Sequence, residues 1–202
     1  MKINLGKTVL RINISFAAAV TLTLILDESG MCAVSLFCCI VHETGHLISL
    51  AVFGEKPGLI ELSFYGIKLE RKSDRERKLI EEIIIYASGP AANLVLWALL
   101  FFLGRTDGMK TAAAISLFVG LFNLMPCRPL DGGNILGIIL ERLTDWEKSE
   151  RIGFFAACGI IAPMAAAGVT VFVKSGNPTL LAVSIYLALI TAFDKKEKGI
   201  KI

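Results

Sequence analysis

The sequence predicts an all-α polytopic membrane protein with about six transmembrane helices, and three observations favour this fold class. Hydrophobic residues make up 54% of the 202 positions, whereas a soluble domain has roughly 45–50% apolar residues. The mean hydropathy is +0.66. The apolar residues are also grouped in long stretches, with the basic residues placed unevenly between them.

Six apolar stretches approach the length of a bilayer crossing, which needs about 20 apolar residues, or fewer where the bilayer thins. They cover approximately residues 12–26, 31–53, 83–103, 111–126, 152–173 and 178–193. No clear cleavage site follows the first stretch, so we expect a retained helix there and not a secretory signal. Six crossings place both termini on the same side of the membrane.

The basic residues indicate which side that is. If the N-terminus is inside, eighteen of the 21 Lys and Arg residues lie in inside segments, and the three outside are Arg105, Lys110 and Lys174. An excess of this kind is typical of cytoplasmic loops. We therefore expect a multi-pass protein of the cell membrane with both termini cytoplasmic. The net charge of +3 then reflects membrane topology and implies no nucleic-acid partner.

We expect one integral-membrane domain over residues 1–202, with a core over about 31–142 and additional helices at about 12–26, 152–173 and 178–193. Between the second and third spans, the stretch PGLIELSFYGIKLERK alternates apolar and polar residues. This alternation predicts a short β-hairpin over about 58–70, with an apolar face and an edge strand. The five cysteines are odd in number and form no CxxC pair, so they do not predict a disulfide framework.

Three ionisable residues interrupt the second apolar stretch in VHETGH: His42, Glu43 and His46. Polar and charged groups at membrane depth cost several kcal/mol unless they are paired or bind a metal. Histidines four positions apart lie one above the other on a helix, so they can share one metal ion. Glu43 flanks that face and can act on a metal-bound water. The chain contains no other histidine.

A catalytic zinc usually has three protein ligands, so this pair needs a partner. Asp131 is the leading candidate because it lies between two apolar stretches, in NLMPCRPLDGGNILGIIL. Helix-breaking residues surround it: Pro126, Pro129, Gly132 and Gly133. Irregular backbone at membrane depth is tolerated where it lines a cavity. Three alternatives stay open: Asp131 as a helix cap in an interfacial turn, Cys127 as the third ligand, and Cys38 replacing a histidine.

A third polar element is the stretch YASGPAANLVLW, in which Gly89 and Pro90 weaken the predicted helix and Asn93 follows within an apolar run. Asn93 either makes an interhelical hydrogen bond or points into the metal cavity and binds substrate backbone or an oxyanion. Asn123 allows the same two interpretations. In the predicted topology, HETGH, Asn93 and Asp131 all lie near the cytoplasmic side, so we expect the active-site side there.

Together, HETGH, SGPAAN and NLMPCRPLDGG resemble the site-2 protease family of intramembrane zinc metalloproteases (M50), and most closely its stage IV sporulation protease branch. The resemblance covers roughly residues 10–145. It implies that one zinc per chain is bound by His42, His46 and Asp131, that Glu43 is the catalytic acid/base, and that Asn93 and Asn123 assist. The supporting or substrate-binding residues would include Gly89, Pro90, Pro126 and Gly132. No PDZ or CBS domain is expected, which leaves the regulation open.

We therefore expect an intramembrane zinc metalloprotease that cleaves a membrane-embedded or membrane-associated protein in regulated intramembrane proteolysis. The interpretation also allows for a membrane-bound regulatory partner. The main alternative is a catalytically inactive zinc-binding membrane scaffold, which would be expected to lack Glu43 or a ligand. A small transporter is a second alternative, but it would not need the HExxH spacing, and the sequence has no internal repeat of the kind that transporters often carry.

Overall fold

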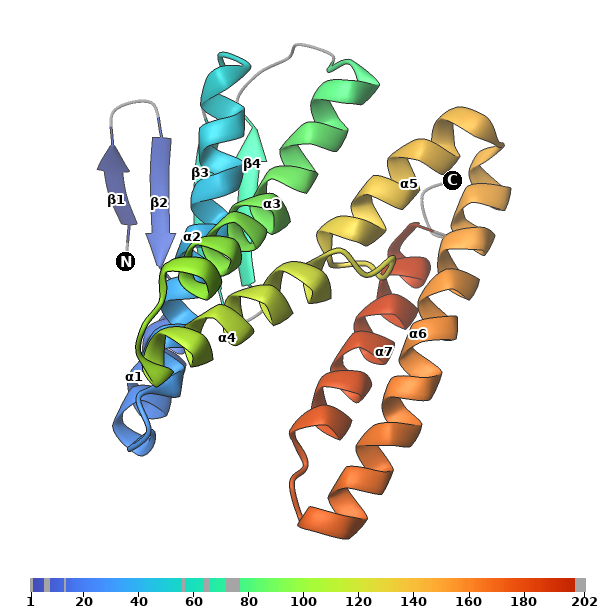
Figure 1. Cartoon of the computed structure of the whole chain (residues 1–202). Coiled ribbons are helices and arrows are strands. Elements are labelled where there is room, and N and C mark those ends of the chain that lie inside the picture. Colours follow the sequence, from blue (N-terminus) through green and yellow to red (C-terminus); the bar gives the residue numbers. More distant parts are fainter. Residues whose placement is uncertain are drawn as a thin grey trace. The chain divides into compact units, whose positions relative to one another are not determined.

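The structure is a computed structural model that describes residues 2–5, 8–12, 14–55, 57–63, 66–71 and 77–198. Figure 1 shows its elements, which are seven helices and four strands within these residues. The helices are α1 (Ile14–Leu26), α2 (Met31–Val52), α3 (Leu79–Leu103), α4 (Asp107–Asn123), α5 (Asp131–Leu143), α6 (Trp146–Ser175) and α7 (Thr179–Lys198). The strands are β1 (Lys2–Leu5), β2 (Thr8–Ile12), β3 (Pro57–Ser63) and β4 (Gly66–Arg71).

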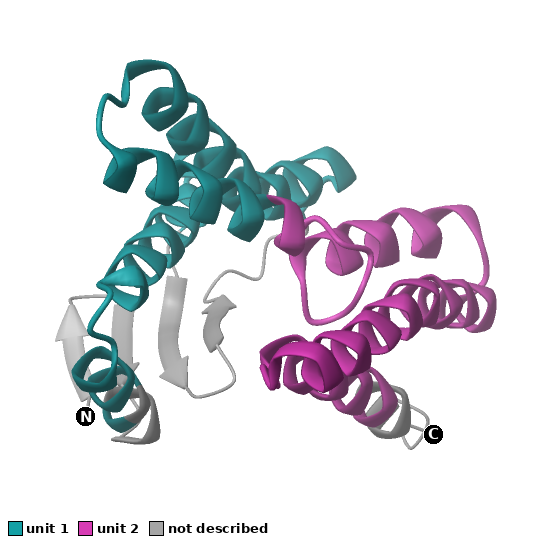
Figure 2. Ribbon diagram, turned by 60° about the horizontal axis from the view of Figure 1, so that its bottom comes forward, with its two compact units in different colours: residues 1–120 teal, residues 121–202 magenta. Residues whose placement is uncertain are grey.

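The internal contacts divide the chain into two compact units, which Figure 2 colours separately. The first unit comprises Met1–Gly120 and the second Leu121–Ile202. The first therefore contains the four strands, α1 to α3 and most of α4, and the second contains the last three residues of α4 with α5 to α7. The expectation of a single domain over residues 1–202 stays a prediction.

Each of the six predicted apolar stretches coincides with a helix, and α5 is an additional helix of 13 residues. Among the described residues, three helices are long and apolar enough to cross a membrane: Met31–Val52, Leu79–Leu103 and Trp146–Ser175. The apolar part of α7, Thr179–Phe193, is shorter. These helices support a membrane protein, while the count of six crossings and their orientation stay predictions.

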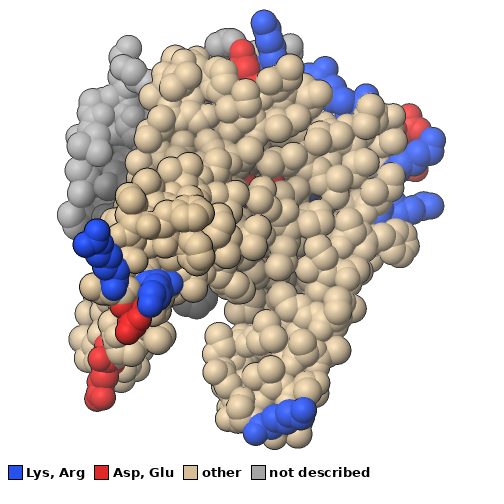
Figure 3. Space-filling model, viewed as in Figure 1, with Lys and Arg blue, Asp and Glu red and all other residues tan. Residues whose placement is uncertain are grey.

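The flanks of these helices expose large apolar side chains. In a soluble protein such surfaces would be buried, whereas in a bilayer they contact lipid. Figure 3 shows that on this face the charged side chains gather near helix ends and leave the flanks between them uncharged. More than half of the residue surface is exposed at Phe37, Ile40, Ile48, Val95, Phe101, Phe155 and Phe193, and also at Phe118 of α4.

The four strands form one sheet in the order β1-β2-β3-β4. β1 pairs antiparallel with β2, β2 parallel with β3, and β3 antiparallel with β4. The hairpin predicted over 58–70 falls on β3 and β4, where Ile60 faces Leu69, and residues 64 and 65 lie outside the described residues. β1 and β2 were not predicted from the sequence. β2 joins the sheet by pairing with β3, about 50 positions away, and β1 pairs only with β2.

In the second unit, α6 and α7 form a helical hairpin that contains the buried core of that unit. The backbones come close where Gly168 of α6 meets α7, since a Cβ there would lie 2.8 Å from the Cα of Leu181. The buried core consists of Cys127, Ala157, Ile161 and Leu187, with Phe122, Leu130, Met164, Val183 and Tyr186 packed against them. The core thus includes residues just before Asp131, which ties that segment to the helical hairpin.

Candidate metal centre

His42 and His46 lie on successive turns of α2, and both are buried. Their Nε2 atoms are 3.2 Å apart. The rings are nearly perpendicular, with an interplanar angle of 84° and centroids 4.8 Å apart. The four-residue spacing therefore places two nitrogen donors side by side, as the sequence predicts.

The tautomer of His46 follows from its partner in α3. Its Nδ1 lies 2.7 Å from the backbone carbonyl oxygen of Ile85. A carbonyl oxygen can only accept a hydrogen bond, so Nδ1 carries the proton and donates it. The neutral ring then has a lone pair on Nε2, which is the form that binds a metal. Hydrogen bonds of this kind orient metal-binding histidines and raise their basicity.

The geometry of the pair fits a zinc ion. Two nitrogens bound to a tetrahedral zinc at about 2.05 Å lie roughly 3.3 Å from each other. The observed separation of the two Nε2 atoms is 3.2 Å. Neutral imidazole is also a donor that zinc favours. The distance, the tautomer and the burial of both rings therefore all suit this metal.

Two glycines allow α2 and α3 to approach closely enough for this arrangement. A Cβ at Gly89 would overlap Nε2 of His46 and would lie 2.9 Å from Cε1 of His42. Likewise, a Cβ at Gly45 of α2 would overlap the carbonyl oxygen of Ser88 in α3. The imidazoles thus occupy space that any side chain at position 89 would fill. Gly89 supports the site by its lack of a side chain.

Helix α3 runs without interruption through Gly89 and Pro90, from Leu79 to Leu103. The sequence predicts a weakened helix at this point because proline removes one backbone donor and crowds the preceding turn. Instead, Pro90 is buried within the helix. The segment therefore supports the site as a regular helix packed against α2.

Glu43 follows His42 on α2 and is half-buried. One position along a helix turns the side chain by about 100°, so Glu43 flanks the face that carries the two imidazoles. This placement is compatible with a carboxylate that acts beside a metal without being a ligand.

Asn93 of α3 is fully buried. Neither its amide nitrogen nor its amide oxygen makes a hydrogen bond within the described part of the chain. Its backbone carbonyl does accept one, from the Oγ of Ser116 in α4 at 2.9 Å. The interhelical hydrogen bond at this position thus uses the backbone and leaves the amide available. An unsatisfied buried polar group costs about 1–3 kcal/mol, which argues against a purely structural amide.

Asp131 is the first residue of α5, after the N-cap residue Leu130. The sequence predicts an unwound segment here, but the helix begins at the aspartate itself. A helix N-terminus stabilises negative charge, so this position favours the ionised carboxylate that binds a metal. The next two residues are glycines because the preceding loop packs directly on the helix. A Cβ at Gly132 would lie 2.7 Å from the carbonyl oxygen of Met125, and one at Gly133 would lie 2.5 Å from the backbone nitrogen of Arg128.

The two cysteine alternatives have other surroundings. Cys127 is fully buried in the core of the second unit, and its Sγ lies 3.7 Å from the Oγ1 of Thr191. Cys38 is also fully buried, and its Sγ lies 4.0 Å from the backbone carbonyl oxygen of Ala112 in α4. Both thiols therefore pack among side chains and backbone as small buried groups. Of the remaining predicted residues, Asn123 ends α4 and is half-buried, and Pro126 lines a pocket described below.

A buried ion pair connects the end of α2 with the start of α3. The Nε of Arg77 donates to Oε1 of Glu55 at 2.9 Å and to Oε2 at 3.0 Å. The side chains are only 8% and 5% exposed. This hydrogen bonding raises the pKa of Arg77 further above its ordinary value, so the guanidinium stays charged. Sequence patterns do not single out either residue, because the two are 22 positions apart.

Comparisons with known proteins place these features in a family context. Residues 106–166, which include Asp131, match the model of Peptidase family M50. A zinc metalloprotease of Methanocaldococcus jannaschii is 30% identical over 122 residues, covering 56% of this chain and 35% of that protein. Stage IV sporulation protein FB of Bacillus subtilis is 24% identical over 118 residues, covering 56% of this chain and 41% of that protein. The predicted resemblance to the site-2 protease family is confirmed.

The fold agrees with this result. A site-2 protease from Methanocaldococcus jannaschii matches with a TM-score of 0.65 over 95% of this chain and 93% of that chain, at 21% sequence identity. The chain is thus similar in fold to a site-2 protease, and its long apolar helices support a membrane protein. It spans about a third to two-fifths of the length of the two curated relatives. Zinc is the metal that the donor pair and these relatives indicate.

Proposed function

We propose that this chain is an intramembrane zinc metalloprotease that cleaves membrane-embedded or membrane-associated proteins. The observation that carries the proposal is the buried pair of imidazoles on an apolar helix, with Nε2 atoms 3.2 Å apart and the His46 tautomer set by the Ile85 carbonyl. A pair of this kind at membrane depth is costly unless it serves chemistry. The zinc metalloprotease among the relatives supports the same activity.

Asp131 would be the third protein ligand, beside His42 and His46. A carboxylate at the first position of α5 lies at a helix N-terminus, where negative charge is favoured. The surroundings of Cys127 and Cys38 support this choice, because both thiols pack within other parts of the structure. Three protein ligands leave one position for water, which is the usual arrangement in catalytic zinc sites.

The proton transfers would fall to Glu43. When bound, zinc would supply Lewis acidity, lowering the pKa of a coordinated water and polarising the scissile carbonyl. Glu43, on the flank of the same helix, would accept the proton of the attacking water and pass it to the leaving nitrogen. This role needs a carboxylate close to the histidine face but not on it, as the position directly after His42 provides.

Asn93 would provide a hydrogen-bond donor for the substrate. Its amide is fully buried and makes no hydrogen bond within the described residues. Such an amide can donate to an oxyanion or to the peptide backbone next to the scissile bond. Because its backbone carbonyl is already held by Ser116, the position of Asn93 does not depend on what its amide binds.

The substrate must be locally unwound, because a transmembrane helix keeps its peptide bonds within its own hydrogen bonds. An extended segment could then add to the edge of a sheet. Among the described strands, β4 lies at one edge, next to β3. We propose this edge as the docking strand; the alternative is that the hairpin anchors the protein at the membrane surface. The topology that goes with this function has multiple spans and a cytoplasmic active-site side.

Replacing Glu43 by Gln tests the proposed function. The substrate would be a single-span model protein with helix-weakening residues in its cytoplasmic half, reconstituted with the enzyme in vesicles. We expect the wild type to cleave it, and Glu43→Gln to lose roughly 10²–10⁴-fold in rate while it still binds one zinc. Glu147→Gln is the matched control, because that side chain is exposed at the start of α6.

Two outcomes would contradict the proposal. Activity of Glu43→Gln near that of the wild type would remove the acid/base role. A wild type that binds zinc but cleaves none of a panel of such substrates would favour the inactive scaffold.

A further inference from the structure

Arg128 lies in the turn just before Asp131 and bridges to two helices of the second unit. Its Nη1 is 3.0 Å from Oε1 of Glu150 in α6. Its Nη2 is 3.5 Å from Oε1 of Glu141 in α5. The Arg128 and Glu150 side chains are each less than a quarter exposed. One guanidinium therefore links the turn to both helices that follow it.

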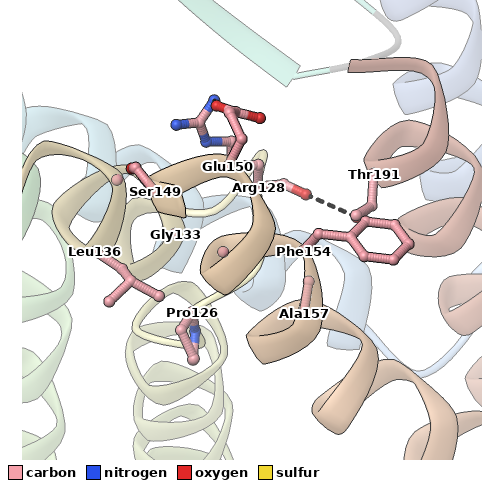
Figure 4. Close-up of a pocket in the computed structure, with 11 residues that line it drawn as sticks. Pro126, Arg128, Gly133, Leu136, Ser149, Glu150, Phe154, Ala157 and Thr191 are labelled. Atoms are coloured by element: carbon pink, nitrogen blue, oxygen red, sulfur yellow. Dashed lines mark hydrogen bonds and ion pairs between the residues drawn. The ribbon is translucent and has the colours of Figure 1, made fainter. Parts of the chain in front are cut away.

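Gly137 of α5 leaves room for the guanidinium against the helix. A Cβ at Gly137 of α5 would lie 2.7 Å from Nη2 of Arg128 and 3.5 Å from its Cζ. The glycine thus leaves the space in which the guanidinium lies against the helix. Figure 4 shows Arg128 beside Glu150 at a small pocket. The pocket has a volume of about 30 Å³ and is also lined by Pro126, Gly133 and Ser149.

Backbone hydrogen bonds connect the turn that carries Arg128 to the first turn of α5, which begins at Asp131. The backbone nitrogen of Leu130 donates to the carbonyl oxygen of Cys127 at 2.8 Å, which closes the turn around Arg128. The carbonyl of Arg128 accepts a hydrogen bond from the Oγ1 of Thr191 at 3.4 Å, drawn as a dashed line in Figure 4. The carbonyl of Leu130 accepts from the backbone nitrogen of Asn134 at 3.1 Å and so starts α5. Asp131 is the next residue.

We propose that Arg128 is a positioning residue for Asp131. The guanidinium fixes the turn to α5 and α6, and the turn fixes the first residue of α5, so the carboxylate is held where a ligand is needed. This inference rests on the proposed function, since it takes Asp131 as a zinc ligand. Arg128 itself contacts neither metal nor substrate in this account. Partners that orient a ligand typically contribute 10–100-fold to metal affinity.

The test is the zinc affinity of the full-length purified protein, measured by competition with a chromogenic chelator. We expect Arg128→Met to weaken zinc binding roughly 10–100-fold. In an Asp131→Ala background, the same substitution should change the affinity less than about twofold, because residues that act through one another are not additive. Arg142→Met is the matched control, an exposed arginine in the last turn of α5, and should bind zinc like the wild type.

Charge reversal tests whether Arg128 acts through its ion pair with Glu150. Arg128→Glu alone should weaken zinc binding, and the combination with Glu150→Arg should restore most of the affinity. If Arg128→Met does not fold, Glu150→Gln removes one partner and is expected to weaken zinc binding in the wild-type background only.

Three results would overturn the inference or its basis. Wild-type zinc affinity in Arg128→Met would exclude the positioning role. An equally large effect of Arg128→Met with and without Asp131 would assign the residue to general stability. Unchanged zinc binding in Asp131→Ala would instead overturn the proposed ligand set, on which the inference depends.

Discussion

The histidines of the first unit and the aspartate of the second are presented in different ways. In the first unit, two adjacent turns of one long helix present the imidazoles, and the neighbouring helix supplies a carbonyl for His46 and a glycine for space. In the second unit, a single carboxylate stands at the first position of a short helix, after a turn that packs on glycines. Helix periodicity therefore puts the histidines on one face, whereas the position of Asp131 depends on the packing of a loop.

The ion pairs of the two units differ in how far they are buried. Glu55 and Arg77 are almost completely buried, with side chains 5% and 8% exposed. The cluster around Arg128 is more open, since Glu150 is 22% and Glu141 40% exposed. A buried pair that loses one partner leaves an uncompensated charge, whereas partly exposed pairs contribute less to stability. We expect the Glu55–Arg77 pair to contribute mainly to the free energy of unfolding. We expect the cluster around Arg128 to determine mainly the position of Asp131.

The largest predicted effect concerns the buried pair. Glu55→Ala leaves the guanidinium of Arg77 buried without its carboxylate, and breaking a buried pair costs about 3–5 kcal/mol. We expect a large drop in the Tm measured by circular dichroism in detergent. Glu28→Ala, an exposed glutamate between α1 and α2, should leave Tm unchanged. If Glu55→Ala keeps the Tm of the wild type, the contrast between the two ion clusters is wrong.

A second prediction concerns the space beside the imidazoles. In Gly89→Ala the new methyl group would overlap Nε2 of His46, so one ring must move. Misplacement of a catalytic group by about 1 Å can cost roughly 100-fold in rate, and we expect a loss of this size in cleavage of the model substrate. Gly108→Ala is the control, because nothing lies within 4 Å of a Cβ there. Equal rates for the two variants would contradict the close packing of α2 and α3.

The smallest predicted effect concerns Asp27, between α1 and α2. The Ser29 hydroxyl and the Cys32 backbone nitrogen donate to the Asp27 carboxylate and lower its pKa. A lowered pKa in the folded state stabilises at neutral pH, and this stabilisation is lost as the pH falls through that pKa. Asp27→Asn should therefore lower Tm slightly at pH 7, and this difference should shrink as the pH falls below the ordinary carboxyl pKa of about 3.9. A Tm difference that does not shrink on acidification would contradict this account.

Much of the site follows from the sequence because its main features are local. The spacing of His42 and His46 determines that their rings meet on one helix face, and the Pro/Gly-rich segment marks Asp131. The role of Gly89 could not be predicted in the same way, because the crowding comes from rings on a different helix. The sequence analysis interpreted Gly89 and Pro90 as helix-weakening, but tertiary packing keeps α3 intact.

The features that sequence analysis misses depend on contacts between distant positions. The start of α5 at Asp131 is one example, since local propensity predicts that Pro129, Gly132 and Gly133 break the helix, while in the structure the glycines let the loop pack on its first turn. The strands β1 and β2 are another, because β2 pairs with β3 across two intervening helices. The pairs Glu55–Arg77 and Arg128–Glu150 likewise join residues 22 positions apart.

The central claim is that one zinc is held by His42 and His46 together with Asp131, and the most direct test is the zinc bound per chain. The measurement compares Asp131→Ala, His46→Ala and Cys127→Ser after purification and dialysis against a weak chelator. The account predicts that Asp131→Ala loses zinc as His46→Ala does, while Cys127→Ser retains one zinc per chain. Full retention in Asp131→Ala, together with loss in Cys127→Ser, would contradict it and assign the third ligand to the thiol.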